Sequence, residues 1–226
     1  MRRVILFVLM LAPAVAFAQD HRWELTPTVG LRWGGNLLLD ENAYYTYLPG
    51  LYEVPLANNG EFGLRFGWLM SKSLELELMY SKQLTEFKDN HGLFGEVPGG
   101  FMPEDAMGPL DTDVATWQLG LVWHILTGHT RPYLVFGVGQ STITSVTPLP
   151  DETALTLGLG AGVKIDLSET LGLLFELRYM RSDTDEGNTV LLEWEYRDCV
   201  GTCQYTYGYG DTFSQGSLAA GLIIAF

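Results

Sequence analysis

The feature that most constrains the fold is an alternation of apolar residues with small, polar or charged ones at a period of two. Successive side chains of a β-strand point to opposite faces, so this period indicates strands and not helices. Beyond the N-terminal region, no segment has the roughly 20 uninterrupted apolar residues of a membrane helix. The alternating segments are residues 23–33, 61–70, 74–80, 115–125, 131–141, 154–167, 171–179 and 218–226. The chain is therefore predicted to be all-β.

The two faces of these segments differ in a way that favours a barrel over a soluble sandwich. The apolar faces contain no charged residue, while the opposite faces are crowded with glycine. A sandwich would be expected to place polar side chains on its outer face. Glycine instead makes room inside a narrow cylinder, because the interior of an eight-stranded barrel is only just wide enough for its own side chains. We expect a closed eight-stranded antiparallel up-and-down transmembrane β-barrel.

The glycine-bearing faces also carry nearly balanced charges. They hold Glu24, Glu61, Glu75, Glu77 and Glu176 together with Arg32, Arg65, Lys164 and Arg178, and His124 lies among them. An unpartnered buried charge is costly. This near balance, in a chain that is strongly acidic as a whole, predicts a salt-bridge network inside a closed lumen.

Connections between the segments alternate in length. Those at 71–73, about 126–131 and 168–170 are short, whereas those near 35–60, 87–112, 142–153 and 182–212 are long. Transmembrane barrels have short periplasmic turns and long extracellular loops, and this rhythm matches them. Ten strands remain an alternative to eight, because the last long connection could add a hairpin to the wall. Pro27 interrupts a regular ladder, and we expect a local bulge there.

Aromatic residues are spaced as interfacial belts on the apolar faces. Trp23 and Trp33 lie ten residues apart, which is roughly 33 Å of strand, or about 25 Å along the normal of a tilted barrel. That distance matches the apolar band of such barrels. The belt residues are Trp23, Trp68 and Trp123 at the periplasmic side, and Trp33, Tyr80, Trp117 and Tyr179 at the outer side.

The N-terminus and the cysteines indicate export. Arg2 and Arg3 precede an apolar run, and Ala16 to Ala18 presents the small residues of a signal-peptidase site, so residues 1–18 are expected to be a signal peptide. The formal net charge of −14 then becomes −16 in the mature domain, residues 19–226. Cys199 and Cys203 are expected to form a disulfide in an oxidising compartment. A metal site is not expected, since no histidine lies near them.

The ensemble of these features resembles the small outer-membrane β-barrel proteins of OmpA/OmpX type. The resemblance is carried by the signal peptide, the opening WELTPTVGLRWGG, the strand RPYLVFGVG and the ending GLIIAF. It implies a bacterial outer-membrane location and a signal for the barrel-assembly machinery at Leu222, Ile224 and Phe226. No segment follows Phe226 that could form the peptidoglycan-binding domain of some relatives, so a wall-anchoring role is not expected.

The long connections suggest a surface role. They contain 17 of the 27 acidic residues and eight of the 11 tyrosines. These residues are either a solvated rim or a recognition surface, because tyrosines give contact area at low entropic cost. We expect an anchor for surface loops, a monomer in contact with lipid and lipopolysaccharide that binds no nucleic acid. A small passive porin or lateral conduit is the alternative.

Catalysis and cofactors are not expected. His124 with the inward carboxylates is the one enzyme-like group, but its neighbourhood HIL lacks the serine of lipid A hydrolases, and omptin-like proteases need ten strands. The glycine-rich runs at 137–142 and 158–162 lack the spacing and the lysine of a phosphate loop.

Overall fold

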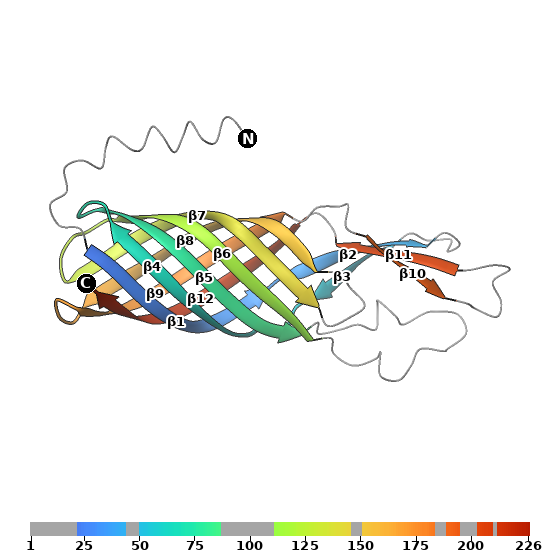
Figure 1. The fold of residues 1–226 in the computed structure, drawn as a ribbon, viewed down its shortest axis with the longest axis horizontal. Coiled ribbons are helices and arrows are strands. Elements are labelled where there is room, and N and C mark those ends of the chain that lie inside the picture. Colours follow the sequence, from blue (N-terminus) through green and yellow to red (C-terminus); the bar gives the residue numbers. More distant parts are fainter. Residues whose placement is uncertain are drawn as a thin grey trace, which may run out of the picture.

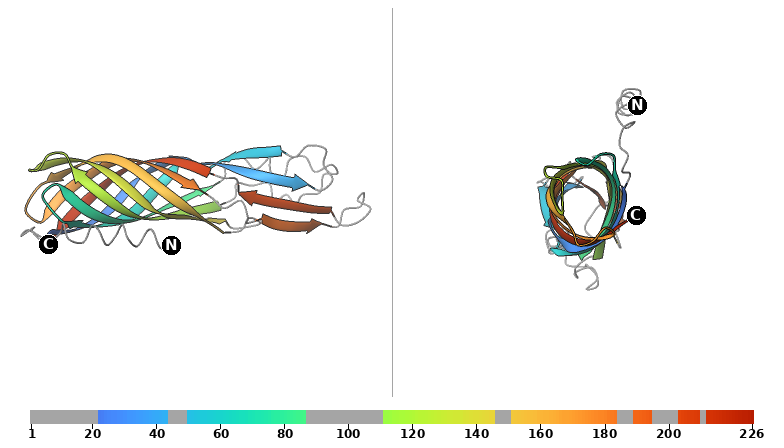
Figure 2. Two further views of the ribbon diagram at one scale, coloured as in Figure 1. Left: turned by 90° about the horizontal axis from the view of Figure 1, so that it is seen from above. Right: turned by 90° about the vertical axis from the view of Figure 1, so that its left-hand side faces the viewer.

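Eight long strands close a barrel, and four shorter strands form a separate sheet (Figure 1). The computed structural model describes residues 22–43, 50–86, 111–145, 151–183, 189–194, 203–209 and 212–226. The barrel strands are β1 (Arg22–Gly34), β4 (Asn59–Leu69), β5 (Leu74–Glu86), β6 (Asp111–His124), β7 (Thr130–Ser145), β8 (Glu152–Asp166), β9 (Leu171–Asp183) and β12 (Thr212–Ala225). Each pairs antiparallel with its neighbours, and β12 pairs with β1 to complete the ring seen end-on in Figure 2. The predicted eight-stranded barrel is confirmed.

The two ends of the barrel differ. Residues 70–73, 125–129 and 167–170 connect consecutive strands at one end, which we call the turn end. Ser71 and Ser168 accept hydrogen bonds from the backbone N–H of Leu74 and Leu171 there (3.1 and 3.0 Å), as serine commonly does in turns. The connections from β1 to β4, from β5 to β6 and from β9 to β12 are long and leave from the opposite end, the loop end, as predicted. The prediction of a long connection near 142–153 was wrong, because β7 and β8 extend to Ser145 and from Glu152 and leave only residues 146–151 between them.

The four shorter strands project beyond the loop end as one sheet, which we call the projecting sheet (Figures 1 and 2). They are β2 (Asn36–Ala43), β3 (Gly50–Pro55), β10 (Thr189–Trp194) and β11 (Cys203–Tyr209), in the order β10-β11-β2-β3. The hairpin formed by β10 and β11 therefore pairs with β2 from the first long connection and does not enter the barrel wall. This arrangement decides the choice between eight and ten wall strands.

The projecting sheet is joined to the barrel by two bends. Gly34 and Gly35 adopt φ values of 79° and 99° between β1 and β2, a left-handed conformation that favours glycine. After β3, the backbone N–H groups of Leu56 and Ala57 bond to the carbonyls of Gly35 (3.0 Å) and Glu86 (2.8 Å). These bonds tie the base of the sheet to the loop end.

Pro27 is accommodated without the expected bulge. Its position pairs with Leu64 in β4, and the register between these strands is unchanged from Arg22 to Arg32. Towards β12, the pairs Leu25 with Ile224 and Thr28 with Gly221 keep one register as well, but Thr26 and Pro27 are unpaired. The prediction of a bulge was wrong. The missing proline N–H leaves a gap in the ladder and adds no residue.

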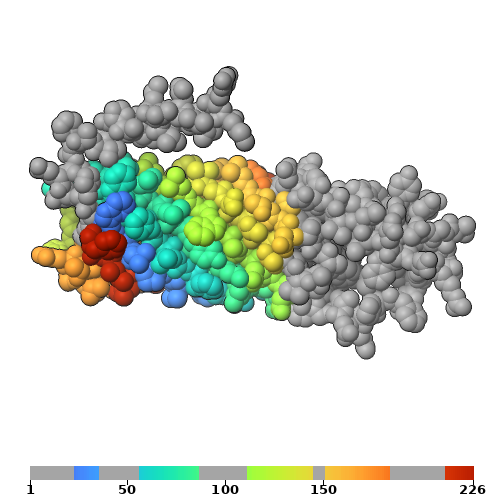
Figure 3. Space-filling model, in the orientation of Figure 1, coloured from blue at the N-terminus to red at the C-terminus, as the bar shows by residue number. Residues whose placement is uncertain are grey.

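Burial alternates along the wall strands, as the sequence pattern predicts. On β8, Thr156 is fully buried while its neighbours Leu155 and Leu157 are exposed, and Leu159 is 64% exposed. Figure 3 shows the outer side chains as a continuous surface on the face that it presents. In the part of the chain that the structure describes, no helix has the length and hydropathy needed to cross a membrane. The predicted signal peptide and Cys199 lie outside the described residues.

Candidate functional site

The candidate site is the interior of the barrel, where glycines leave space for large polar side chains. A Cβ atom added to Gly158 would lie 2.6 Å from Oε1 of Gln118, and one added to Gly137 would lie 3.0 Å from the same atom. At Gly162 an added Cβ would lie 2.5 Å from the hydroxyl oxygen of Tyr133. Neighbouring side chains thus fill the space beside these inward glycines, so the glycines do not leave an open channel.

The central cluster joins two arginines and two glutamates near the middle of the lumen. Arg178 donates to Glu176 (Nε–Oε1 2.7 Å) and to Glu77 (Nη2–Oε1 2.7 Å). Arg65 donates to Oε2 of Glu176 (2.6 Å), which also accepts a hydrogen bond from Tyr133 (2.7 Å). The four charged side chains are at most 6% exposed. Each charge faces an opposite one, which offsets the several kcal/mol that an unpaired buried ion costs.

The turn-end cluster lies below it and consists of Glu24, Glu75, His124, Arg131, Lys164 and Asp166. The ammonium of Lys164 contacts Glu24 (2.8 Å) and Glu75 (2.7 Å) from opposite strands of the barrel. Glu75 also lies 2.9 Å from Nε2 of His124. Arg131 extends the chain of charges, because its Nη2 is 2.9 Å from both Glu24 and Asp166. The cluster links five strands across the lumen.

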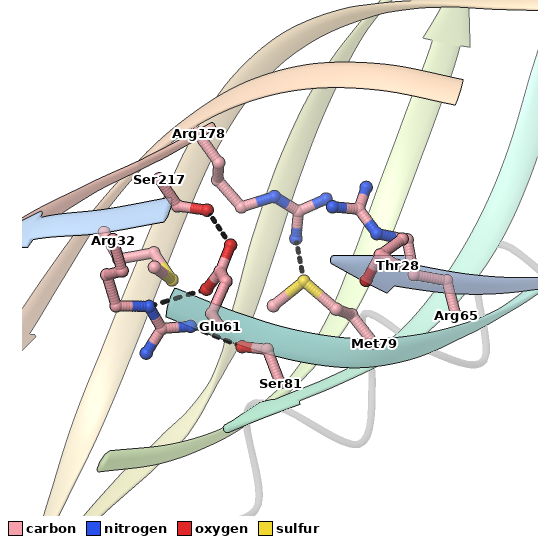
Figure 4. A pocket seen from close by; sticks show the side chains of 9 residues that line it. Thr28, Arg32, Glu61, Arg65, Met79, Ser81, Arg178 and Ser217 are labelled. Carbon is pink, nitrogen blue, oxygen red and sulfur yellow. Dashed lines mark hydrogen bonds and ion pairs between the residues drawn. The ribbon is translucent and has the colours of Figure 1, made fainter. Parts of the chain in front are cut away.

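The loop-end cluster contains Arg32 and Glu61, whose Nε and Oε2 atoms lie 2.8 Å apart. Arg32 also donates to the hydroxyl of Ser81, while Ser217 donates to Glu61 (Figure 4). A further hydrogen bond joins Nη1 of Arg32 to the hydroxyl of Thr116 (3.3 Å). Between this cluster and the central one is a cavity of about 10 Å³, enough for a single water molecule.

Hydroxyl and apolar side chains fill the lumen above the loop-end cluster. Thr116 bonds to Ser141 (2.9 Å), which accepts from Thr156 (2.8 Å). Further out, Gln83 donates to the carbonyl of Ala57 (3.2 Å) and accepts from Gln215 (3.1 Å). A set of buried apolar side chains occupies the same end of the barrel: Leu56, Val114, Ile143, Ala154 and Phe213. The barrel mouth is therefore filled as well.

The structure places all ten predicted lumen residues inside the barrel and joins them in the three clusters. Sequence reasoning missed Arg131 and Asp166, which complete the turn-end cluster, and also Tyr133 and Gln118. Arg131 has the same parity as Tyr133 and Gly137 on β7, so the alternation of that strand was sufficient to assign it to the lumen. Asp166 is the last residue of β8, where alternation alone is a weak guide.

The aromatic residues predicted as belts lie on the outer surface towards the two ends. Trp23 stacks on Trp68 at the turn end (ring centroids 5.5 Å), and Tyr80 contacts Trp117 towards the loop end (4.5 Å). The remaining predicted members are Trp123 at the turn end and Trp33 and Tyr179 towards the loop end. Beyond Tyr80 on the same outer face, an ion pair joins the side chains of Lys82 and Asp113 (2.7 Å). Polar side chains thus resume beyond the aromatic residues.

The C-terminal strand closes the barrel next to the first strand. The backbone N–H and C=O groups of Phe226 each bond to Trp23 (3.0 Å). Leu222, Ile224 and Phe226 are exposed on the outer face, with Phe226 at 67%. The residues proposed as an assembly signal therefore form one outward row.

His124 is a buried member of the turn-end cluster. It is 1% exposed, and its ring is also edge-on to Tyr133 (centroids 5.9 Å). No group of three or more metal-ligating side chains occurs among the described residues. Fold and site together define a closed barrel with an apolar outside and a lumen filled by paired charges, which is the organisation of a transmembrane β-barrel.

The comparisons identify the family. The model of the outer membrane protein beta-barrel domain matches residues 4–197, so the chain belongs to this family of bacterial outer-membrane proteins. Its fold is similar to that of the outer membrane protein OprG from Pseudomonas aeruginosa, with 14% identity over 92% of this chain and 97% of that one, and a TM-score of 0.59. It is also similar to the outer membrane protein AlkL, with 15% identity over 93% of this chain and 92% of that one, and a TM-score of 0.52. No curated protein sequence matches the chain significantly.

Proposed function

We propose that this protein is a closed outer-membrane anchor whose function is to present the projecting sheet and the long loops at the cell surface. In this proposal the turn end faces the periplasm and the loop end faces outwards. The observation that carries it is the filled lumen, which three clusters of paired charges and the buried side chains of the barrel mouth occupy. A barrel closed in this way acts through what it holds outside the membrane.

The attachment of the projecting sheet supports a presenting role. Leu56 is 2% exposed in the mouth of the barrel, and Ala57 beside it accepts hydrogen bonds from Gln83 and Thr85 (3.2 and 2.7 Å). The base of β3 is therefore held by buried contacts, in addition to the bend at Gly34 and Gly35. Fixed attachment reduces the entropy lost when a surface binds a partner.

Two measurements test the proposal. Planar-bilayer recording of the purified protein is expected to show no conductance steps, whereas stable steps would contradict a closed lumen. Cells that produce the full chain are expected to adhere to a protein-coated surface more than cells with a variant in which both projecting hairpins are replaced by short turns. Equal adhesion of the two strains, at equal amounts of assembled barrel, would refute the surface role.

We also propose that Leu222, Ile224 and Phe226 direct assembly by the barrel-assembly machinery, and that the barrel is a monomer among lipid and lipopolysaccharide. The outward row on β12 supports the first part, because its side chains remain accessible at the strand that closes the ring. A catalytic role is not proposed. The buried His124–Glu75 contact in the turn-end cluster is explained by charge pairing.

A conduit for small apolar solutes is the second candidate, and one observation favours it. The ladder between β1 and β12 lacks pairing at Thr26 and Pro27, which is a weak point in the wall between lumen and lipid. A Pro27→Val variant regains the N–H group and could close that gap. If the conduit exists, the variant should slow the entry of a fluorescent apolar solute into proteoliposomes. The anchor proposal instead predicts no protein-dependent entry with either form.

A further inference from the structure

The cavity between the central and loop-end clusters has a mainly cationic and hydrogen-bonding lining (Figure 4). Three arginines, Arg32, Arg65 and Arg178, line it together with one glutamate, Glu61. Three hydroxyl-bearing side chains and two methionines complete the lining, and the nine residues come from β1, β4, β5, β9 and β12. The cavity is therefore enclosed by strands from a large part of the wall and not by one local turn.

Arg65 brings an unused hydrogen-bond donor to this cavity. The residue is 5% exposed, and its Nη1 donates to Glu176 (2.6 Å). Its Nε has no hydrogen-bond partner among the described residues. The Nε atoms of the other two lining arginines do have partners, because Arg32 donates to Glu61 (2.8 Å) and Arg178 donates to Glu176 (2.7 Å). A buried donor without an acceptor is costly, so Arg65 requires an acceptor.

Glu61 supplies unused acceptor capacity to the same cavity. Its Oε2 accepts from Nε of Arg32, and its Oε1 accepts from the hydroxyl of Ser217. Each oxygen of an ionised carboxylate can accept two hydrogen bonds, so the Glu61 carboxylate can accept further ones. A small molecule that both accepts and donates would therefore satisfy Arg65 and Glu61 together.

Size and charge select the kind of molecule. The cavity volume of about 10 Å³ corresponds to a single water-sized sphere. The two clusters beside the cavity already balance three positive charges with three negative ones. A bound anion would add a buried charge without a partner, which is costly. A neutral molecule the size of water fits both limits.

We propose that this cavity binds one water molecule, which accepts a hydrogen bond from Nε of Arg65 and donates one to the carboxylate of Glu61. Among the described residues, no hydrogen bond or ion pair joins the central and loop-end clusters directly. The water would connect them, since a bridging water is nearly as favourable in enthalpy as a direct hydrogen bond. This inference concerns the interior of the barrel and goes beyond the proposed surface role.

The test uses the mature protein in lipid nanodiscs, with ¹⁵N-labelled arginine, and measures nuclear Overhauser effects between water and the Nε–H groups. The Nε–H of Arg65 is expected to show a cross-peak with water. The Nε–H groups of Arg32 and Arg178 are matched internal controls, because they line the same cavity but donate to carboxylates. Their cross-peaks should be much weaker. Absence of the Arg65 cross-peak, or equal cross-peaks for all three arginines, would overturn the proposal.

Two further measurements identify the molecule that gives the cross-peak. Thr28→Val removes a hydroxyl group from the lining at nearly constant volume, and the Arg65 cross-peak should persist. Its loss would assign the effect to the exchanging threonine proton and refute the water. Replacing chloride by gluconate should leave the Arg65 Nε–H chemical shift unchanged, whereas a chloride-dependent shift would show that an anion occupies the cavity instead.

Failure of this inference is distinguishable from failure of the anchor proposal. If planar-bilayer records are silent and Arg65 shows no water cross-peak, the water site is wrong and the closed barrel stands. If stable conductance steps accompany strong water cross-peaks at all three arginines, the lumen is open and both proposals fail.

Discussion

Breaking the Arg32–Glu61 pair tests whether the lumen depends on charge pairing. The Nε–Oε2 distance is 2.8 Å, and the side chains are 0% and 6% exposed. At a charge separation of about 4 Å and an effective dielectric constant of about 20, the attraction is worth about 4 kcal/mol. Glu61→Gln leaves the arginine as an unpartnered buried ion, and removing one partner of such a pair costs about 3–5 kcal/mol. We expect the free energy of unfolding to fall by about that amount.

The double variant separates pairing from packing. Arg32→Met combined with Glu61→Gln removes both charges and keeps similar volumes, so it should be more stable than either single variant, because replacing a whole buried pair is often near neutral. The assay is urea unfolding in lipid vesicles followed by tryptophan fluorescence. A loss below about 1 kcal/mol for Glu61→Gln, or single losses that simply add in the double variant, would refute the reasoning.

Three further predictions concern the wall and its assembly. Leu159→Arg should reduce the folded fraction in vesicles, because a cation at mid-membrane costs about 2–4 kcal/mol, whereas Leu167→Arg in a turn, at a similar exposure of 62% against 64%, should not. Gly158→Val should lower stability by about 1–3 kcal/mol through overpacking in the lumen, while Gly60→Val, where an added Cβ has its nearest neighbour at 3.9 Å, should have little effect in the same urea assay. Phe226→Ser should reduce the heat-modifiable, folded band in outer membranes from growing cells while the purified variant still folds in detergent; an undiminished band would contradict a role as an assembly signal.

The barrel was predictable because every wall strand shows the same two-residue alternation. A two-residue alternation assigns each side chain of a strand such as β8 to lipid or lumen, and the length of the connections gives the strand order. The projecting sheet was only partly predictable. A hairpin in the last long connection, near 182–212, is suggested by the sequence, but the pairing of β11 with β2 joins residues far apart in the chain. Such pairing depends on where the barrel places the two connections, which local sequence does not encode.

The sequence predicts which residues face the lumen, but not which of them contact each other. Parity places Glu75 and Lys164 inside, yet their contact depends on strand tilt and on the stagger summed over the strands between them. The same limit explains Asp166, which is drawn into the turn-end cluster by Arg131 at the end of a neighbouring strand. Pro27 shows a different limit. A proline in a strand predicts an irregularity in the hydrogen-bond ladder. Only the pairing register of β1 with β4 and β12 shows that this irregularity is a gap and not a bulge.

The three charge clusters and the barrel mouth follow one another along the axis of the lumen. An ion crossing the barrel would therefore have to pass each of them in turn. An ion that passes the turn-end cluster meets the Glu176–Arg178 contacts of the central cluster next, and then Arg32 with Glu61. Beyond these it meets the mouth, where the buried side chains of Leu56 and Phe213 lie at the same end as the bonded pair Gln83 and Gln215. Because each closure uses different residues, neutralising one cluster leaves the others intact. A change of charge in a single cluster is therefore expected to lower the stability of the barrel without opening a path for ions. The lumen charges control stability and not permeation.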